Sequence, residues 1–278
     1  MVIISKLTAL GRPVVFSYST NRLVVLLSLT VLAGILLYRL ALADPFLEAI
    51  GAAAVSAFAF FLCWAISREL DPIREWSAFA GLPLTMVAAF ILGPPALISL
   101  VFVLLLGRLI NGSTGRRATP LDLAILLVLG TVLFNNGVLT GLPVLAAAFG
   151  IDAATASTGK NQTAAALLAL VLFALMLLFF YPEHDYAAGF NVYTGPAALA
   201  VVISTAILAL RPGKTRAFDD TGTGPLDNRR IFLARVVVAI FIVSELFLNG
   251  SGALVMFYPA CFAYLGTAVY NLARRDDH

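Results

Sequence analysis

Long apolar runs separated by short polar breaks dominate the chain. Runs of about 20 mostly apolar residues recur along it, each able to cross a hydrocarbon core of about 30 Å. Because a segment in lipid must satisfy its own backbone hydrogen bonds, we expect these runs to be helices. The pattern predicts an all-α, polytopic transmembrane bundle with eight clear spans, at 23–38, 45–67, 77–92, 96–109, 163–181, 194–210, 231–248 and 253–272.

A further run, 121–149, is too long for one ordinary span and is interrupted by Asn135-Asn136-Gly137. If the chain turns back there, it has about ten membrane segments, with both termini and every basic residue except Arg39 on the cytoplasmic face. A single crossing would place all basic residues from Lys160 onward outside. We therefore predict a returning hairpin. Each arm of about 15 residues reaches only roughly 22 Å, so a double crossing and a re-entrant hairpin both stay open.

This topology divides the chain into three parts. We expect a cytoplasmic N-terminal segment at 1–22, a single transmembrane domain at 23–273 and a short cytoplasmic tail at 274–278. The polar connection 211–230 is too short for a soluble domain, so any chemistry must come from helix ends and short loops. We expect a multi-pass protein of a cell membrane, either the plasma or the inner membrane.

Composition supports a membrane protein, with 61% hydrophobic and 12% charged residues against about 25% charged in soluble domains. The positive-inside bias explains the net charge of +3 better than nucleic-acid binding does. Cys63 and Cys261 each stand alone in an apolar run and are interpreted as small buried hydrophobes. We expect no metal, no cofactor and no nucleic acid. The expected partners are the lipid bilayer and a small-molecule or lipid ligand.

Five charged residues cluster between two of the spans: Arg68, Glu69, Asp71, Arg74 and Glu75. The topology places this charged segment on the cytoplasmic face, beside Arg108 and Asn111. In one interpretation its side chains pair locally and hold two helices together. In the other, Asp71 and Glu75 share a helix face and bind a divalent ion or diphosphate, while the arginines neutralise phosphate oxygens. Pro72 interrupts the segment and counts against the shared face.

A second polar group lies within the apolar runs. Glu245 falls inside 231–248, and Asn249, four residues on, shares its helix face. A charge at the bilayer centre costs about 2.5 kcal/mol or more and is often functional, although Glu245 is close enough to a helix end to reach the interface instead. Asn135 and Asn136 either form a simple turn or line a polar cavity. These four residues are the candidates for an intramembrane polar path.

Two similar segments, beginning Gly81-Leu-Pro83 and Gly141-Leu-Pro143, run in opposite directions in this topology. Broken segments of this kind are found at transporter binding sites. The favoured hypothesis is a small-solute transporter or permease-like protein, with the charged segment as a cytoplasmic gate. The alternatives are a membrane-embedded enzyme acting on a lipid phosphate or diphosphate at the cytoplasmic face, and a non-catalytic membrane scaffold. Intramembrane prenyltransferases carry two aspartate-rich motifs and this chain has one acidic loop, so we assign no family.

Overall fold

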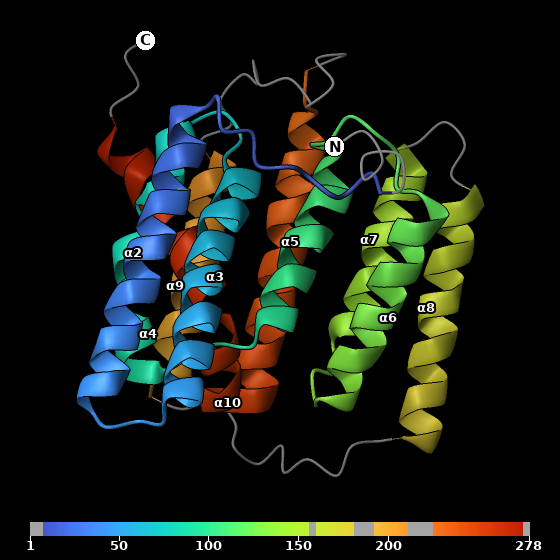
Figure 1. Ribbon diagram of the computed structural model, residues 1–278. Coiled ribbons are helices and arrows are strands. Elements are labelled where there is room, and N and C mark those ends of the chain that lie inside the picture. Colours follow the sequence, from blue (N-terminus) through green and yellow to red (C-terminus); the bar gives the residue numbers. More distant parts are fainter. Residues whose placement is uncertain (1–7, 156–159, 181–191, 211–224, 275–278) are drawn as a thin grey trace.

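A computed structural model of the protein describes residues 8–155, 160–180, 192–210 and 225–274. Its regular secondary structure in these ranges is helical, as the sequence predicts (Figure 1). The elements are α2 (Ser19–Ala41), α3 (Phe46–Leu70), η1 (Glu75–Phe79), α4 (Leu82–Leu92), α5 (Leu97–Asn111), α6 (Pro120–Asn135), α7 (Gly141–Thr155), α8 (Lys160–Phe179), α9 (Thr194–Leu210) and α10 (Asn228–Ala273).

Five of the helical stretches in the described ranges are long and apolar enough to cross a membrane: α2, α3, η1 with α4, α8 and α10. The helices α5, α6, α7 and α9 are apolar but shorter. The chain thus has the helices of a membrane protein. Helix length alone gives fewer spans than the ten segments predicted above, so that number and the cytoplasmic placement of the termini stay predictions.

The helix α10 is a hairpin rather than one straight rod. At Gly250 the backbone has φ 53° and ψ −131°, a conformation that glycine tolerates and side-chain-bearing residues rarely adopt. The Tyr264 hydroxyl donates to the Arg235 carbonyl at 2.6 Å, and the Phe241 and Phe257 rings meet edge-on at 5.3 Å. The two arms are therefore antiparallel, as the separate apolar runs 231–248 and 253–272 predict.

The predicted break in the run 121–149 is also present. Helix α6 ends at Asn135 and α7 begins at Gly141, with Gly137 at φ 83° between them. The start of α6 has a local cause as well: Thr119 and Asp122 form a capping box, with Pro120 in the first turn. Local backbone chemistry therefore explains both ends of α6.

Consecutive helices run in alternating directions between the two ends of the bundle (Figure 1). At one end, which we call the charged end, Thr20 contacts Glu75 and Arg74 contacts Asn271, so the start of α2 and the end of α10 both lie beside the charged segment. At the opposite end, the chain turns at Gly93, Gly137 and Gly250. We call this the glycine end.

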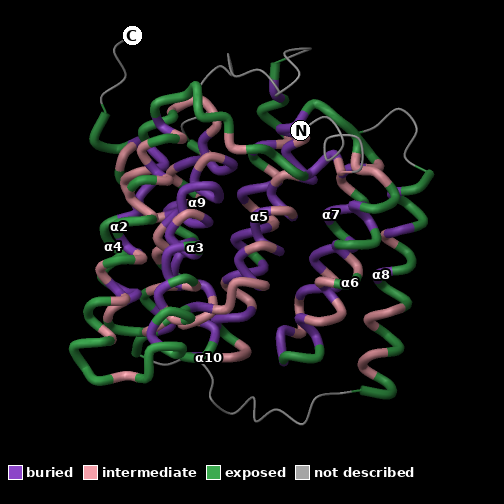
Figure 2. Tube along the Cα trace, in the orientation of Figure 1, coloured by how far each residue is buried: buried purple, intermediate pink, exposed green. Residues whose placement is uncertain are grey.

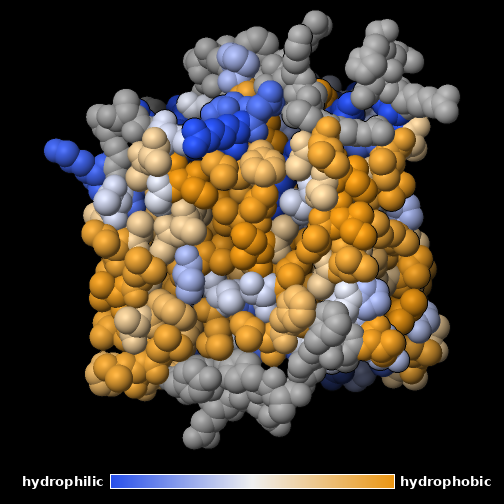
Figure 3. All heavy atoms as spheres, turned by 180° about the vertical axis from the view of Figure 1, so that it is seen from behind, coloured by the Kyte–Doolittle hydropathy of each residue, from blue (hydrophilic) through white to orange (hydrophobic). Residues whose placement is uncertain are grey.

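Burial divides the helices into inner and outer ones (Figure 2). The most apolar stretch of α3 is 61% buried, whereas those of α2 and α8 are 17% buried. Seen from behind, most of the face of the bundle is apolar, and hydrophilic residues gather above this apolar region (Figure 3). Exposed leucines on outer helices need no protein partner in a bilayer, because lipid chains solvate them.

The helices form two units. Helices α6, α7 and α8 pack on one another to form a three-helix unit, which contacts the rest mainly through α5 and α10 (Figure 1). Within it, the Phe134 and Phe173 rings meet edge-on at 6.1 Å. The remaining helices, α2 to α5, α9 and α10, form the main body, in which Phe102 and Phe241 meet at 5.4 Å. How the two units are joined determines where a site can lie.

Candidate functional site

The centre of the charged segment is a buried ion pair. Glu69 lies at the end of α3 and is 5% exposed. Its Oε1 accepts a hydrogen bond from Arg108 Nε at 3.1 Å, and Arg12 lies 4.0 Å away. Asn111 Nδ2 donates to Glu69 Oε2 at 3.1 Å and to the Glu69 carbonyl at 2.9 Å. The sequence placed Arg108 and Asn111 beside this segment, and the structure brings them into direct contact with it.

Asp71, the next acidic residue along the chain, faces α10. Asp71 is 2% exposed and accepts a hydrogen bond from Asn271 Nδ2 at 2.9 Å. Arg74 donates to Asn271 Oδ1. The buried Arg235 closes the same region by donating to the carbonyls of Leu70 and Leu208, each at 2.7 Å. Sequence reasoning missed Asn271 and Arg235, because both come from α10, distant in the chain.

The helical face proposed for Asp71 and Glu75 is not formed. Asp71 leaves the helix at φ −137° and ψ 79°, and the 3-10 helix begins only at Glu75. Glu75 points to other partners, Arg68 at 3.7 Å and the Thr20 hydroxyl at 3.4 Å. Pro72 accounts for the break, because its ring and missing N–H end the helix. Within the described residues, no three His, Cys, Asp or Glu side chains are arranged to hold a metal ion.

The second candidate group centres on Glu245, which is fully buried. Its Oε1 accepts hydrogen bonds from the backbone N–H of Thr140, at 2.8 Å, and from the Thr140 hydroxyl. Its Oε2 accepts from Asn249 Nδ2 at 2.6 Å, and the same amide donates to the Gly137 carbonyl at 3.0 Å. Thr140 precedes α7, so the carboxylate lies at the positive end of the helix dipole.

The two asparagines of the turn do not join this group. Asn135 and Asn136 are exposed, and the Asn136 amide donates to the Val132 carbonyl at 2.7 Å. They form the turn rather than line a cavity with Glu245. The residue that sequence reasoning missed is Thr140, although a threonine just before Gly141-Leu-Pro143 is a recognisable helix cap.

A further ion pair links the same two helices at the charged end. Arg230 Nη2 of α10 lies 2.7 Å from Asp152 Oδ1 of α7, and Asp152 is 6% exposed. Arg230 also donates to the carbonyls of Ile110 and Leu109, at 2.6 and 3.0 Å, where α5 ends. A cation is favourable at this negative end of a helix dipole. No local pattern in the chain indicates that these two residues form a pair.

Together these contacts define the α7–α10 interface, which joins the three-helix unit to the main body. Thr140 and Glu245 close it toward the glycine end, and Asp152 and Arg230 close it toward the charged end. The 15 residues from Arg230 to Glu245 span roughly 22 Å of helix. The interface therefore has a polar contact near each end, and the distance between the two contacts is shorter than the hydrocarbon core of about 30 Å.

Comparisons with protein families, curated proteins and solved structures give no match for this chain. Geometry and chemistry are therefore the basis for any functional proposal.

Proposed function

We propose that the chain is a small-solute transporter in which the three-helix unit moves against the main body. The observation that carries this proposal is the α7–α10 interface, which has a buried polar contact near each of its two ends. Each contact joins one unit to the other, so each can open when the units move. A solute would reach the interface from one side when one contact opens while the other stays closed.

The two contacts have different roles in this proposal. Arg230 and Asp152 neutralise one another and form the gate at the charged end. Glu245 has hydrogen-bond donors around it but no cationic partner among the described residues, so it is the group that binds a cation or a hydrogen-bonding solute. Glu69 and Arg108 both belong to the main body and stabilise it, so the charged segment is not the gate predicted from the sequence.

The proposal keeps the predicted topology of about ten crossings with both termini in the cytoplasm. Its support is the alternating direction of the helices and the gathering of Arg68, Arg108 and Arg230 at the end opposite Arg39. The charged end then faces the cytoplasm, in agreement with the positive-inside bias. Residues 1–22 and 274–278 would be cytoplasmic, in the plasma or inner membrane. The lipid-phosphate enzyme and the scaffold stay hypotheses that no contact among the described residues favours.

Cross-linking tests whether the units must move. In protein with Cys63→Ala and Cys261→Ala, cysteines at positions 152 and 230 would be joined by a short bifunctional thiol reagent with a reducible spacer. The reconstituted protein would be assayed for uptake of labelled amino acids, hexoses, nucleosides and monovalent cations. We expect uptake to fall at least tenfold on cross-linking and to return on reduction.

The matched control places cysteines at Phe134 and Phe173, which face one another inside the three-helix unit. Cross-linking this pair joins helices that move together, so uptake should persist. Equal uptake before and after cross-linking of positions 152 and 230 would contradict the moving-unit proposal. Absence of uptake for every solute of the panel in the unmodified protein would count against transport itself.

A further inference from the structure

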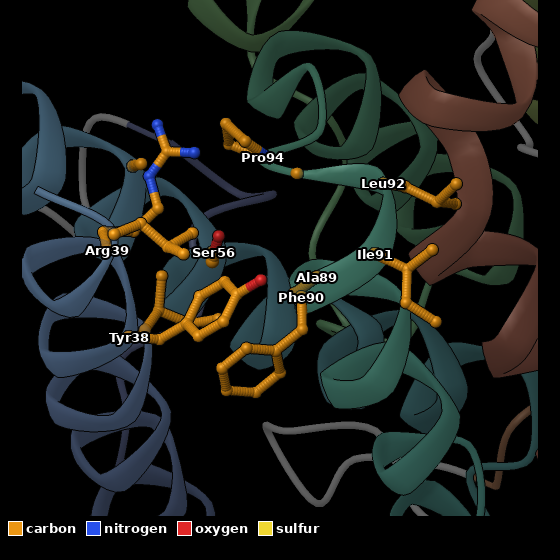
Figure 4. Close-up of a pocket in the computed structure, with 12 residues that line it drawn as sticks. Tyr38, Arg39, Ser56, Ala89, Phe90, Ile91, Leu92 and Pro94 are labelled. Carbon is orange, nitrogen blue, oxygen red and sulfur yellow. The ribbon is translucent and has the colours of Figure 1, made fainter. Parts of the chain in front are cut away.

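A cavity of about 260 Å³ lies at the glycine end, away from the α7–α10 interface (Figure 4). Its walls come from α2, α3 and the end of α4, and the labelled side chains Tyr38, Arg39 and Ser56 face the segment from Ala89 to Pro94 across it. The volume is near the lower limit for small-molecule sites, and it suits a compact polar group.

Ser56 gives the cavity an unsatisfied hydrogen-bonding group. It is 1% exposed, it lines the cavity, and its hydroxyl has no partner. Other hydroxyls on these helices donate back to the carbonyl four residues earlier, as Ser67 does to Cys63 at 2.9 Å and Ser28 does to Val24 at 2.8 Å. A buried polar group without a partner is destabilising, so a partner that enters the cavity would recover that lost free energy.

Arg39 supplies a positive charge at the wall of the cavity. Its Nε lies 2.6 Å from Asp44 Oδ2, which holds the guanidinium at the cavity wall. Its terminal nitrogens have no partner among the described residues, and two adjacent guanidinium N–H groups match the geometry of phosphate oxygens. On the predicted topology Arg39 is the one basic residue that departs from the positive-inside pattern, so its position needs a specific reason.

Helix α4 supplies acceptors on the opposite wall. It ends at Leu92 and is followed by Gly93, Pro94 and Pro95. Because proline has no N–H, the carbonyls of Phe90 and Ile91 cannot make the usual bond to the residue four positions on. One wall of the cavity therefore has the guanidinium of Arg39 and the hydroxyl of Ser56, and the opposite wall has the backbone carbonyls at the end of α4.

The helix surfaces beside the cavity are apolar, as a site for a lipid requires. Side chains on the outer surfaces of the same helices are apolar and exposed, including Leu37 at 69%, Ile91 at 74% and Val87 at 55%. Acyl chains can lie along these surfaces while a headgroup occupies the cavity. A phospholipid would use both the polar wall and these apolar surfaces, which bilayer lipid already contacts, whereas free phosphate would use the polar wall alone.

We propose that this cavity binds the headgroup of a membrane phospholipid. The phosphate accepts hydrogen bonds from Arg39 and Ser56, a headgroup hydroxyl or ammonium donates to the end of α4, and the acyl chains follow α2 and α4. This site is separate from the α7–α10 interface and does not depend on transport.

Binding can be measured by microscale thermophoresis on the full-length protein in detergent, with dioctanoyl phosphatidylglycerol as the probe. We expect saturable binding that weakens about tenfold in Ser56→Ala, as loss of a hydrogen bond to a charged group implies. Arg39→Gln should weaken it further, and Ser56→Leu, which fills the cavity, should abolish it. The matched control is Ser67→Ala on the same helix, whose hydroxyl already bonds within the helix. It should bind like the unmodified protein.

Two further probes decide the chemistry. Dioctanoylglycerol has the chains without the phosphate, and inorganic phosphate has the anion without the chains, so both should bind at least tenfold more weakly. Equal binding of dioctanoylglycerol would overturn the role of phosphate, and equal binding of inorganic phosphate would overturn the lipid assignment. Thermal unfolding of each variant establishes that it is folded. Unchanged binding in a folded Ser56→Leu protein would overturn the site.

Discussion

Two buried glutamates, one near each end of the bundle, are held in opposite ways. Glu69 at the charged end has Arg108 at 3.1 Å and Arg12 at 4.0 Å, so its charge is compensated by cations. Glu245 near the glycine end is surrounded by the N–H and hydroxyl of Thr140 and the amide of Asn249, all uncharged. The first arrangement binds two helices of the main body together. The second arrangement leaves the carboxylate of Glu245 stabilised only by neutral hydrogen-bond donors.

This difference separates a structural group from a functional candidate. Removing one partner of a buried ion pair leaves the other charge unpaired, which is strongly destabilising. Removing the charge of a carboxylate held by neutral donors leaves no unpaired ion behind. Stability should therefore depend on the charge of Glu69, whereas activity should depend on the charge of Glu245.

The largest expected effect is that of Glu69→Gln. The substitution leaves the partly buried Arg108, whose side chain is 12% exposed, without its carboxylate, and we expect a loss of about 3 kcal/mol in the free energy of unfolding. SDS-induced unfolding in mixed micelles measures it. The control is Glu75→Gln in the same segment. Glu75 is 45% exposed and 3.7 Å from Arg68, so that change should cost less than about 1 kcal/mol. Similar losses in the two variants would contradict the assignment of Glu69 as the structural centre.

A smaller loss is expected for Gly250→Ala, which tests how the position of Glu245 is fixed. An alanine side chain is strained at φ 53° and ψ −131°, and this backbone strain should lower the free energy of unfolding by about 1–3 kcal/mol. The matched change is Gly252→Ala in the following turn, where an added Cβ would meet no atom within 4 Å. That variant should be as stable as the unmodified protein or slightly more stable, because alanine favours helix. Equal loss of stability in both would show that the bend at Gly250 does not depend on glycine.

The smallest effect on stability is expected for Glu245→Gln. The amide oxygen can still accept from both groups of Thr140, but the new NH2 group replaces the acceptor of Asn249, whose amide must turn over and give up its bond to the Gly137 carbonyl. With the charge removed as well, the free energy of unfolding should fall by only about 1 kcal/mol. Glu245→Leu removes the acceptors and should cost about 1–3 kcal/mol through the unpaired donors. In the uptake assay, both variants should lose activity. A glutamine variant with full uptake of the transported solute would remove Glu245 from the proposed mechanism.

The helices and their breaks could be predicted from the sequence because they depend on local signals. Apolar length predicted the helices, and glycine and proline predicted several of their ends. The hairpin in α10 was visible as two apolar runs separated at Asn249-Gly250, although the helix assignment there is continuous. These signals act over a few residues and need no knowledge of tertiary contacts.

The candidate sites were predictable only in part, because their partners are distant in the chain. Glu69 and Arg108 share a predicted face of the membrane, and so could be associated in advance. The partners Thr140 of Glu245 and Asn271 of Asp71 lie 105 and 200 residues away. Nothing in the local pattern around Asp152 indicates Arg230. Only the packing of α3 and α7 against α10 brings these groups together.

The turns at Gly93, Gly137 and Gly250 have a consequence for how the chain enters a membrane. On the proposed orientation, these three turns must be carried through the bilayer during insertion, as must the connection between α2 and α3; that connection contains Asp44, whereas the residues of the three glycine turns are uncharged. Each charge moved through the bilayer centre costs about 2.5–3.5 kcal/mol on insertion scales, so neutral loops lower the barrier to passage. Helices flanking such a loop can enter as preformed pairs. Biogenesis in successive hairpins would keep the arginine-rich connections on the side of synthesis throughout.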